Sequence, residues 1–163
     1  MTEAKQDVKV LRVEKASKEV VDALNVLHPQ LAPDTPPVTL LSLERTLGQQ
    51  CCSLFLAYVA DEANSVGTLT VIYYETAVHS RAVIENVVVD SHSRGKGVGK
   101  RLMQVALQFA QERGADVVDL TSRPGRVEAN KLYQAMGFTQ RETNCYRYEI
   151  EKRDTESRKK QKT

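Results

Sequence analysis

The sequence has few cysteines and no metal-binding pattern. Its three cysteines are the adjacent pair Cys51 and Cys52 and, much later in the chain, Cys145. An odd total with two neighbours argues against a framework of disulfide bonds. Because there is no CxxC pair and the three histidines are isolated from one another, we expect no structural zinc site and no other metal centre.

Long apolar runs and an excess of one charge are also missing. The uninterrupted apolar runs are short, as at residues 54–57, whereas a helix needs roughly 20 apolar residues to span a bilayer. The net charge of the 163 residues is only +2, so neither nucleic acid nor an anionic membrane is expected as a partner. Residues 1–7 are polar and lack the apolar stretch of a signal peptide, which favours a cytoplasmic location.

The composition that remains is that of one soluble globular domain. Hydrophobic residues make up 41% of the chain and charged residues 27%, ordinary values for a folded domain. Along the chain, alternation typical of strands gives way to the 3.6-residue period of helices and returns. Together with the glycines and prolines at the boundaries, these periods predict strands at residues 8–13, 53–60, 67–74, 81–89, 117–120 and 145–150, and helices at residues 17–27, 38–47, 97–113 and 127–136.

The predicted order is therefore β-α-α-β-β-β-α-β-α-β, which indicates an α/β fold. Three consecutive strands with short polar connections favour a mixed, mostly antiparallel sheet, and the helices would flank it. We expect this single domain to occupy residues 1–150. Residues 151–163 are almost wholly charged or polar, and we expect them to form a disordered tail.

The strongest functional signal lies between the strand predicted at 81–89 and the helix predicted at 97–113. Glycines there allow the backbone to approach a bulky anion closely. The first N–H groups of the helix have no partner within the helix, and the helix dipole adds partial positive charge at the same place. The turn predicts a cradle for pyrophosphate, and its glycines and basic residues are Gly95, Gly97, Gly99, Arg94, Lys96 and Lys100.

Three phosphate-binding patterns were compared with this segment. A Walker A loop fails at both ends, since Arg94 stands where its first glycine belongs and Arg101 where Ser or Thr should follow the lysine. The dinucleotide pattern Gly-x-Gly-x-x-Gly fails as well, because Lys100 takes the place of its last glycine. The pattern Arg/Gln-x-x-Gly-x-Gly/Ala is met by Arg94, Gly97 and Gly99.

The segment that meets this pattern resembles motif A of the GNAT N-acetyltransferase superfamily, which binds the pyrophosphate of coenzyme A. Residues 128–138 resemble motif B of the same family, with Asn130, Tyr133 and the pair Gly137-Phe138. The resemblance covers about residues 67–138 and implies a GNAT-like domain with acetyl-CoA as cosubstrate. It also implies that the strand before motif A and the next strand separate, leaving a gap for the pantetheine arm.

The resemblance assigns roles to particular residues. The backbone of the strand before motif A would bind the pantetheine and the acetyl carbonyl, motif A would hold the pyrophosphate, and Asn130 would contact the cofactor from the other side of the gap. A backbone N–H directed at the thioester oxygen would stabilise the tetrahedral intermediate. The cofactor-binding residues expected on this basis are Val87, Val88, Val89, Arg94, Gly95, Lys96, Gly97, Val98, Gly99, Lys100, Asn130 and Tyr133.

Acetyl transfer to an amine needs a base, because most amines are protonated at neutral pH. Glu85 is the first candidate, since regular alternation would place it on one face with Val87 and Val89. The alternatives are Glu75, a water relay, or a purely structural Glu85 paired with Arg81. For the departing thiolate, Tyr133 matches the family's usual general acid, and the alternative is a tyrosine that only fills the core.

The acceptor is expected to be a small-molecule primary amine, attacked directly in a ternary complex. A protein lysine or N-terminus, or a coenzyme A-binding module that has lost catalysis, remain alternatives, and a homodimer is compatible with the family. Cys145 is expected to be a small buried hydrophobic residue rather than a nucleophile. Arg123 and Arg126 could bind an anionic acceptor or the cofactor's 3′-phosphate, and the acceptor site is expected to involve residues 25–47, 73–81 and 139–146.

Overall fold

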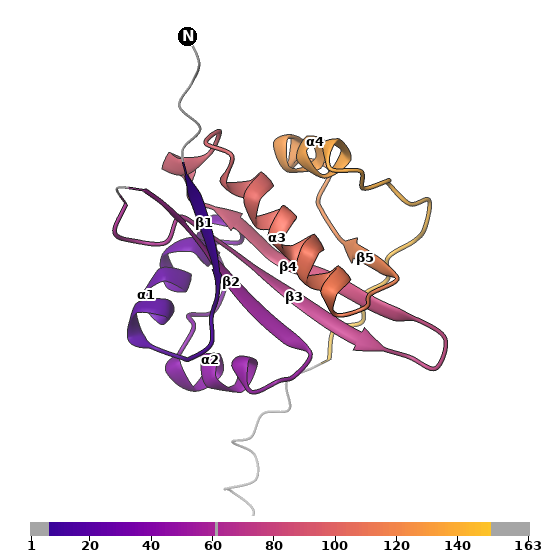
Figure 1. The fold of residues 1–163 in the computed structure, drawn as a ribbon, viewed down its shortest axis with the longest axis horizontal. Helices are drawn as coiled ribbons and strands as arrows, with labels where there is room; N and C mark the ends of the chain where they lie inside the picture. Colours follow the sequence, from indigo (N-terminus) through magenta and orange to yellow (C-terminus); the bar gives the residue numbers. More distant parts are fainter. Residues whose placement is uncertain (1–6, 61, 151–163) are drawn as a thin grey trace, which may run out of the picture.

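The computed structural model describes residues 7–60 and 62–150. They form one five-stranded sheet with the strands in chain order (Figure 1). The first four strands are antiparallel neighbours, and the last is parallel to the fourth, which confirms the predicted mixed, mostly antiparallel sheet. The strands are β1 (Val8–Arg12), β2 (Cys52–Val59), β3 (Gly67–Glu75), β4 (Ser80–Val89) and β5 (Val117–Leu120).

Two short helices follow β1 in the chain. α1 (Lys18–Leu27) begins after Ser17, whose hydroxyl accepts a hydrogen bond from the backbone of the first turn, as the sequence predicts. A 3₁₀ turn, η1 (His28–Gln30), continues from its end. α2 (Leu40–Leu47) begins after Thr39, which forms a reciprocal capping box with Ser42.

The two faces of the sheet have separate cores. On one face, Leu54 and Leu56 of β2 pack with Leu24 of α1 and Leu43 of α2. The other face packs against α3 (Val98–Glu112), which crosses the sheet in Figure 1. α4 (Val127–Ala135) follows β5 in the chain and lies close to the start of α3, where Leu132 is next to Gly99.

The strand predicted at residues 145–150 is wrong. Residues 139–150 form no helix or strand, and the side chains of Tyr146, Tyr148 and Ile150 are at least 85% exposed. Alternating residues can form a strand only where a neighbouring strand pairs with them, and β5 pairs only with β4 among the described residues. Cys145, expected to be buried, is exposed for the same reason. The tail predicted at 151–163 lies outside the described residues.

Among the helices that the structure describes, none combines the length and the apolar character needed to cross a bilayer.

Candidate functional site

An irregularity in β4 determines which side chains reach the site. Thr70 pairs with Glu85 and Thr68 pairs with Val88, so Asn86 and Val87 together lie opposite the single residue Leu69. Asn86 has a positive φ of 54°, a left-handed conformation that asparagine tolerates better than most residues. β4 therefore contains a β-bulge, a feature that redirects side chains and often lies beside active sites.

The bulge places Glu85 on the face opposite to Val87 and Val89. Residues directly across a sheet share a face, and Glu85 lies across from Thr70, which lies across from Leu54 on the face covered by α1 and α2. Val87 and Val89 instead pack in the core beneath α3. The prediction that Glu85 shares a face with these valines is wrong, because it assumed unbroken alternation through Asn86.

β4 and β5 separate where the site begins. Their pairing starts at Arg81 with Val117 and ends at Ile84 with Leu120. Within residues 7–60 and 62–150, residues 85–89 therefore have no strand partner on the β5 side, and their backbone forms an open edge. The predicted separation of the two strands is confirmed.

The turn after β4 has the conformation that its glycines predict. A 3₁₀ turn, η2 (Ser91–Ser93), is followed by Gly95 and Gly97, whose φ angles are 77° and 82°. An added Cβ would meet nothing within 4 Å at either position, so the backbone conformation, not space, requires glycine there. Gly97 begins α3 without a side-chain cap, which leaves the first N–H groups of the helix available to a ligand.

Gly99 and Val98 serve packing as well. A Cβ on Gly99 would lie 3.2 Å from Cδ2 of Leu132, so the missing side chain lets α3 and α4 approach closely. The side chain of Val98 is only 1% exposed. Val98 can therefore contact a ligand only through its backbone.

The basic side chains of the turn differ in their surroundings. Arg94 donates from Nε to the carbonyl oxygen of Val89 at 3.3 Å, and Nζ of Lys96 lies 3.2 Å from Oε1 of Glu62. Lys100 is exposed and takes part in no ion pair within the described part of the chain. Among the described residues, Arg94 is bonded only through Nε, so its other guanidinium N–H groups could meet an anion without loss of that contact, and Lys100 has no such contact to lose.

The alternatives considered for the base have different positions. Arg81 pairs with Asp119 at 3.6 Å, and across residues 7–60 and 62–150 no ion pair includes Glu85. Glu75 pairs across the sheet with Ser80, at the hairpin that joins β3 and β4, and its carboxylate accepts a hydrogen bond from Tyr73. Glu75, the last residue of β3, therefore lies beside the start of β4, and the glycine-rich turn follows the opposite end of β4.

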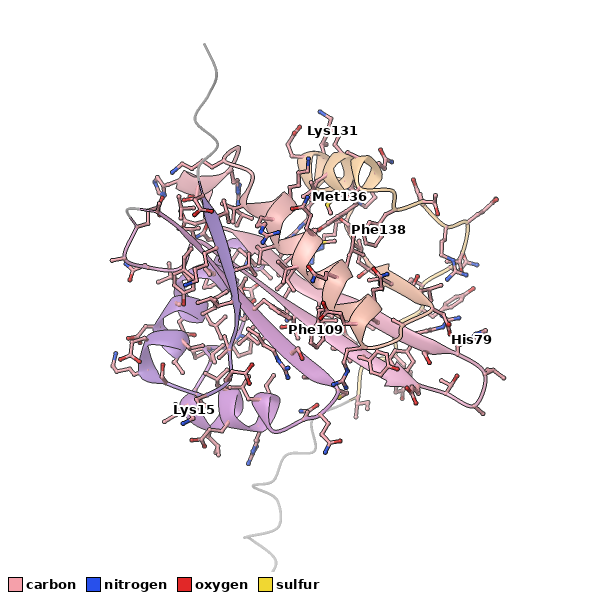
Figure 2. All side chains as sticks on the ribbon, in the orientation of Figure 1. Lys15, His79, Phe109, Lys131, Met136 and Phe138 are labelled. Carbon is pink, nitrogen blue, oxygen red and sulfur yellow. The ribbon has the colours of Figure 1, made fainter. Side chains whose placement is uncertain are left out.

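Tyr133 lies on the inward side of α4. Its side chain is 8% exposed, and its ring meets Phe138 edge to face with centroids 6.1 Å apart. Figure 2 shows Met136 and Phe138 on the side of α4 that faces the rest of the domain, while Lys131 points away. Burial raises the pKa of the Tyr133 phenol, and the positive charge of Arg126 partly opposes that shift.

Asn130 is occupied with the loop that precedes α4. Its Nδ2 donates to the carbonyl oxygen of Arg123 at 3.0 Å, and Pro124 O lies at 3.5 Å. A hollow of about 1190 Å³ beside β5 is lined by Asn130, Tyr133 and residues 139–141, but not by the valines of β4 or the glycine-rich turn. The hollow therefore shares Asn130 and Tyr133 with the expected site but does not include the open edge of β4 or the glycine-rich turn.

Gln30 of η1 and Leu31 after it make contacts that the sequence did not indicate. Gln30 binds the turn after β4, where its Nε2 donates to Oδ2 of Asp90 at 2.8 Å and its Oε1 accepts from the backbone of Ser91 at 3.0 Å. Arg126, which could also bind an anion, donates from Nη2 to the carbonyl oxygen of Leu31 at 2.7 Å. The partners are 60 to 95 residues apart, so no local pattern could have revealed them.

The imidazole of His28, at the start of η1, is the first of the possible metal ligands next to the site. Nε2 of His28 is buried and has no hydrogen-bond partner in the described part of the chain. Burial lowers the pKa of this imidazole, which keeps it neutral at pH 7. Over residues 7–60 and 62–150, no group of three or more His, Cys, Asp or Glu side chains is placed to hold a metal ion.

Comparison with models of known protein families identifies the family of this chain. A family model described as "Acetyltransferase (GNAT) family" matches residues 18–138. The chain belongs to this family. It is 34% identical over 92 residues to human N-acetyltransferase 8B and 34% identical over 91 residues to streptothricin acetyltransferase of Streptomyces lavendulae. These matches cover 55% and 56% of this chain but only 40% and 47% of the two relatives, so the chain matches less than half of either protein.

Solved structures agree on the GNAT fold. An aminoglycoside acetyltransferase from an uncultured soil metagenomic sample, in complex with sisomicin, superposes with a TM-score of 0.77 at 21% identity, over 89% of this chain and 97% of that one. An aminoglycoside N-acetyltransferase in complex with CoA gives 0.73 at 17% identity, over 91% and 99%. At such identities the similarity shows the fold alone.

Proposed function

We propose that this GNAT protein transfers the acetyl group of acetyl-CoA to a primary amine of a small molecule. The observation that carries the proposal is the open backbone edge of residues 85–89, directly followed by a glycine-rich turn and the uncapped start of α3. A thioester can lie along such an edge while a diphosphate meets the helix N-terminus.

The residues of the turn fit a diphosphate. The backbone N–H groups of Val98, Gly99 and Lys100 begin α3 and have no helical acceptor of their own. Gly95 and Gly97 hold the left-handed conformations that let the chain curve around an anion. Arg94, Lys96 and Lys100 supply positive charge, and Arg94 can keep its contact with Val89 through Nε while its other N–H groups meet the diphosphate.

The backbone of Val87, Val88 and Val89 would position the thioester. Bound acetyl-CoA supplies an activated acyl group whose carbonyl oxygen gains negative charge when an amine attacks. A backbone N–H on the open edge would donate to that oxygen and stabilise the charge, the role of an oxyanion hole. Asn130 would contact the cofactor from α4, on the other side of the gap.

Glu85 would accept the proton of the amine, directly or through a water molecule. Its carboxylate projects from the face that α1 and α2 cover, and the segment between those helices is where the family shapes its acceptor site. The bulge at Asn86 therefore lets one strand present a base to the acceptor and a backbone edge to the thioester.

Tyr133 would donate a proton to the departing thiolate. A phenol is protonated at pH 7 at its ordinary pKa, and burial raises the pKa of Tyr133 further, so the proton that a general acid needs is present. The charge of Arg126 opposes part of this shift and would stabilise the phenolate that remains.

A small-molecule acceptor is favoured by the similar proteins, whose names include streptothricin, aminoglycosides and glucosamine-6-phosphate as substrates. A thiol-release assay with acetyl-CoA and a panel of amines tests the proposal. The panel should hold sisomicin, streptothricin, glucosamine-6-phosphate, free amino acids and a lysine peptide. Release of thiol with a small amine supports the proposal, whereas tight binding of acetyl-CoA without release for any amine supports a non-catalytic module.

A further inference from the structure

Residues 28–31 connect two parts of the site that are far apart in the sequence. Gln30 is bonded to Asp90 and Ser91, at the start of the turn that leads to α3. The carbonyl oxygen of Leu31 accepts a hydrogen bond from Arg126, the residue that precedes α4. One short segment therefore touches both the cofactor turn and the helix that carries Tyr133.

The topology explains why these contacts meet. β4 and β5 are parallel, so their C-terminal ends lie at the same end of the sheet. Asp90 and the loop that ends at Arg126 follow these strands and therefore lie at that end too. The strands have already separated at this end, and η1 packs against β4. Residues 28–31 thus extend across the mouth of the gap between β4 and β5.

The contact made by Gln30 uses its whole amide group. Nε2 donates both to Oδ2 of Asp90 at 2.8 Å and to the carbonyl oxygen of Val26 at 3.2 Å, and Oε1 accepts from Ser91 N at 3.0 Å. The amide therefore has a partner for each of its two N–H groups and for its oxygen. The other oxygen of Asp90 accepts from the backbone of His92 at 2.9 Å. The end of α1 and the cofactor turn are thereby held in one fixed relation.

We propose that residues 28–31 form a strap that couples acetyl-CoA binding to the acceptor side of the site, with Gln30 and Arg126 as its positioning residues. This inference rests on the proposed function. A diphosphate that reduces the motion of the turn also restrains Asp90 and Ser91. Because Gln30 is bonded to both, residues 28–31, which border the acceptor, are restrained as well. Arg126 joins Leu31, at the other end of the strap, to the start of α4. The position of Tyr133 on α4 is therefore tied to the position of the strap.

Hydrogen–deuterium exchange of the full chain measures the coupling at the backbone. The amides of Leu31 and Ala32 both donate to the carbonyl oxygen of His28 and so report on the strap, while those of Ser91 and Ser93 report on the turn. The variants are Gln30→Ala, Gln30→Glu, which places a second carboxylate against Asp90, and a matched control, Gln108→Ala. Gln108 is an exposed residue of α3, and in the described part of the chain its side chain bonds to Glu112 alone.

Without ligand, we expect Gln30→Ala to speed exchange at the four reporter amides by about tenfold, and Gln30→Glu by at least as much. Gln108→Ala should leave these rates as in the wild type. Unchanged exchange in both Gln30 variants would overturn the strap, whatever the protein's activity. This ligand-free comparison is independent of the proposed function.

With saturating acetyl-CoA, exchange at Leu31 and Ala32 should slow in the wild type and in Gln108→Ala but not in Gln30→Ala. The KM for acetyl-CoA should rise about three- to tenfold in Gln30→Ala while kcat changes little. Equal slowing in Gln30→Ala would contradict the coupling. If acetyl-CoA changed exchange nowhere in the wild type, the proposed function would fail, and the coupling to it with it, while the ligand-free comparison would still decide whether Gln30 holds the turn.

Discussion

Glu85 and Val87 are two positions apart on β4 but project from opposite faces of the sheet. The bulge at Asn86 separates them, and it allows one strand to serve both the acceptor and the thioester. The proposed chemistry depends on this relation, because a regular strand would point Glu85 into the core beneath α3.

The conformation of Asn86 should matter more than its side chain. Asn86→Val forces a β-branched residue into a left-handed conformation, which should cost about 1–2 kcal/mol in the free energy of unfolding and lower kcat. Asn86→Gly adopts the same φ without steric cost and should retain activity. Urea denaturation and steady-state assays compare the two variants. Equal stability and equal turnover for Asn86→Val and the wild type would show that the bulge is not needed.

Replacing the proposed base should lower turnover and leave cofactor binding nearly unchanged. Glu85→Gln should lower kcat about 100-fold, because an amide cannot take the proton of the amine. The KM for acetyl-CoA should stay within about twofold, since the carboxylate lies on the acceptor face. Glu75→Gln is the matched control. Wild-type kcat in Glu85→Gln would assign the base elsewhere.

Tyr133 should titrate above an ordinary tyrosine, and Arg126 should hold that shift down. NMR of ¹³C-labelled tyrosine can follow the phenol in the wild type, Arg126→Gln and Arg126→Lys. Loss of the charge in Arg126→Gln should raise the pKa of Tyr133 further, whereas Arg126→Lys should keep it nearer the wild-type value. A general acid acts while protonated, so activity should persist to higher pH than an unshifted phenol allows.

In the otherwise wild-type protein, Tyr133→Phe should lower kcat about 100-fold and leave the affinity for acetyl-CoA within about twofold. The phenyl ring keeps the contact with Phe138, so the fold should be preserved. Wild-type turnover in Tyr133→Phe would remove this residue from the mechanism.

Asp90 should titrate below an ordinary aspartate because its charged form accepts hydrogen bonds. The Gln30 amide lowers the pKa of Asp90 most, followed by the backbone N–H of His92. A lowered folded-state pKa means that the stability from this group is present above the unfolded pKa, about 4, and is lost as pH falls through the folded one. Carboxyl NMR titration should show the pKa of Asp90 moving back up in Gln30→Ala but not in Gln108→Ala.

The sequence was sufficient to predict strands β1 to β5 and helices α1 to α4, because each has a clear hydrophobic period, but it did not predict the 3₁₀ turns η1 and η2. It also predicted the glycine-rich turn, since positive φ angles leave few residues other than glycine. The face of Glu85 could not be predicted, because the bulge depends on how β4 pairs with Leu69 of another strand. The contacts of Gln30 and Arg126 join segments far apart in the chain, which no local pattern encodes.

The predicted strand at 145–150 failed for a related reason. Its alternation with Tyr146 and Tyr148 satisfies the local preference of a strand, but a strand also needs a partner and a surface to cover. Both side chains remain exposed in the structure. Predictions from local strand preference were thus correct for the strands that pack in the core. They were wrong for residues 145–150, which are exposed.

An NMR titration of the ¹⁵N-labelled protein with acetyl-CoA tests most directly whether the open edge of β4 and the start of α3 hold the cofactor. We expect saturable shifts concentrated at residues 87–89 on that edge and at residues 97–100 at the start of α3. Absence of saturable binding, or shifts confined to the hollow beside β5 with those two segments unchanged, would contradict this cofactor site.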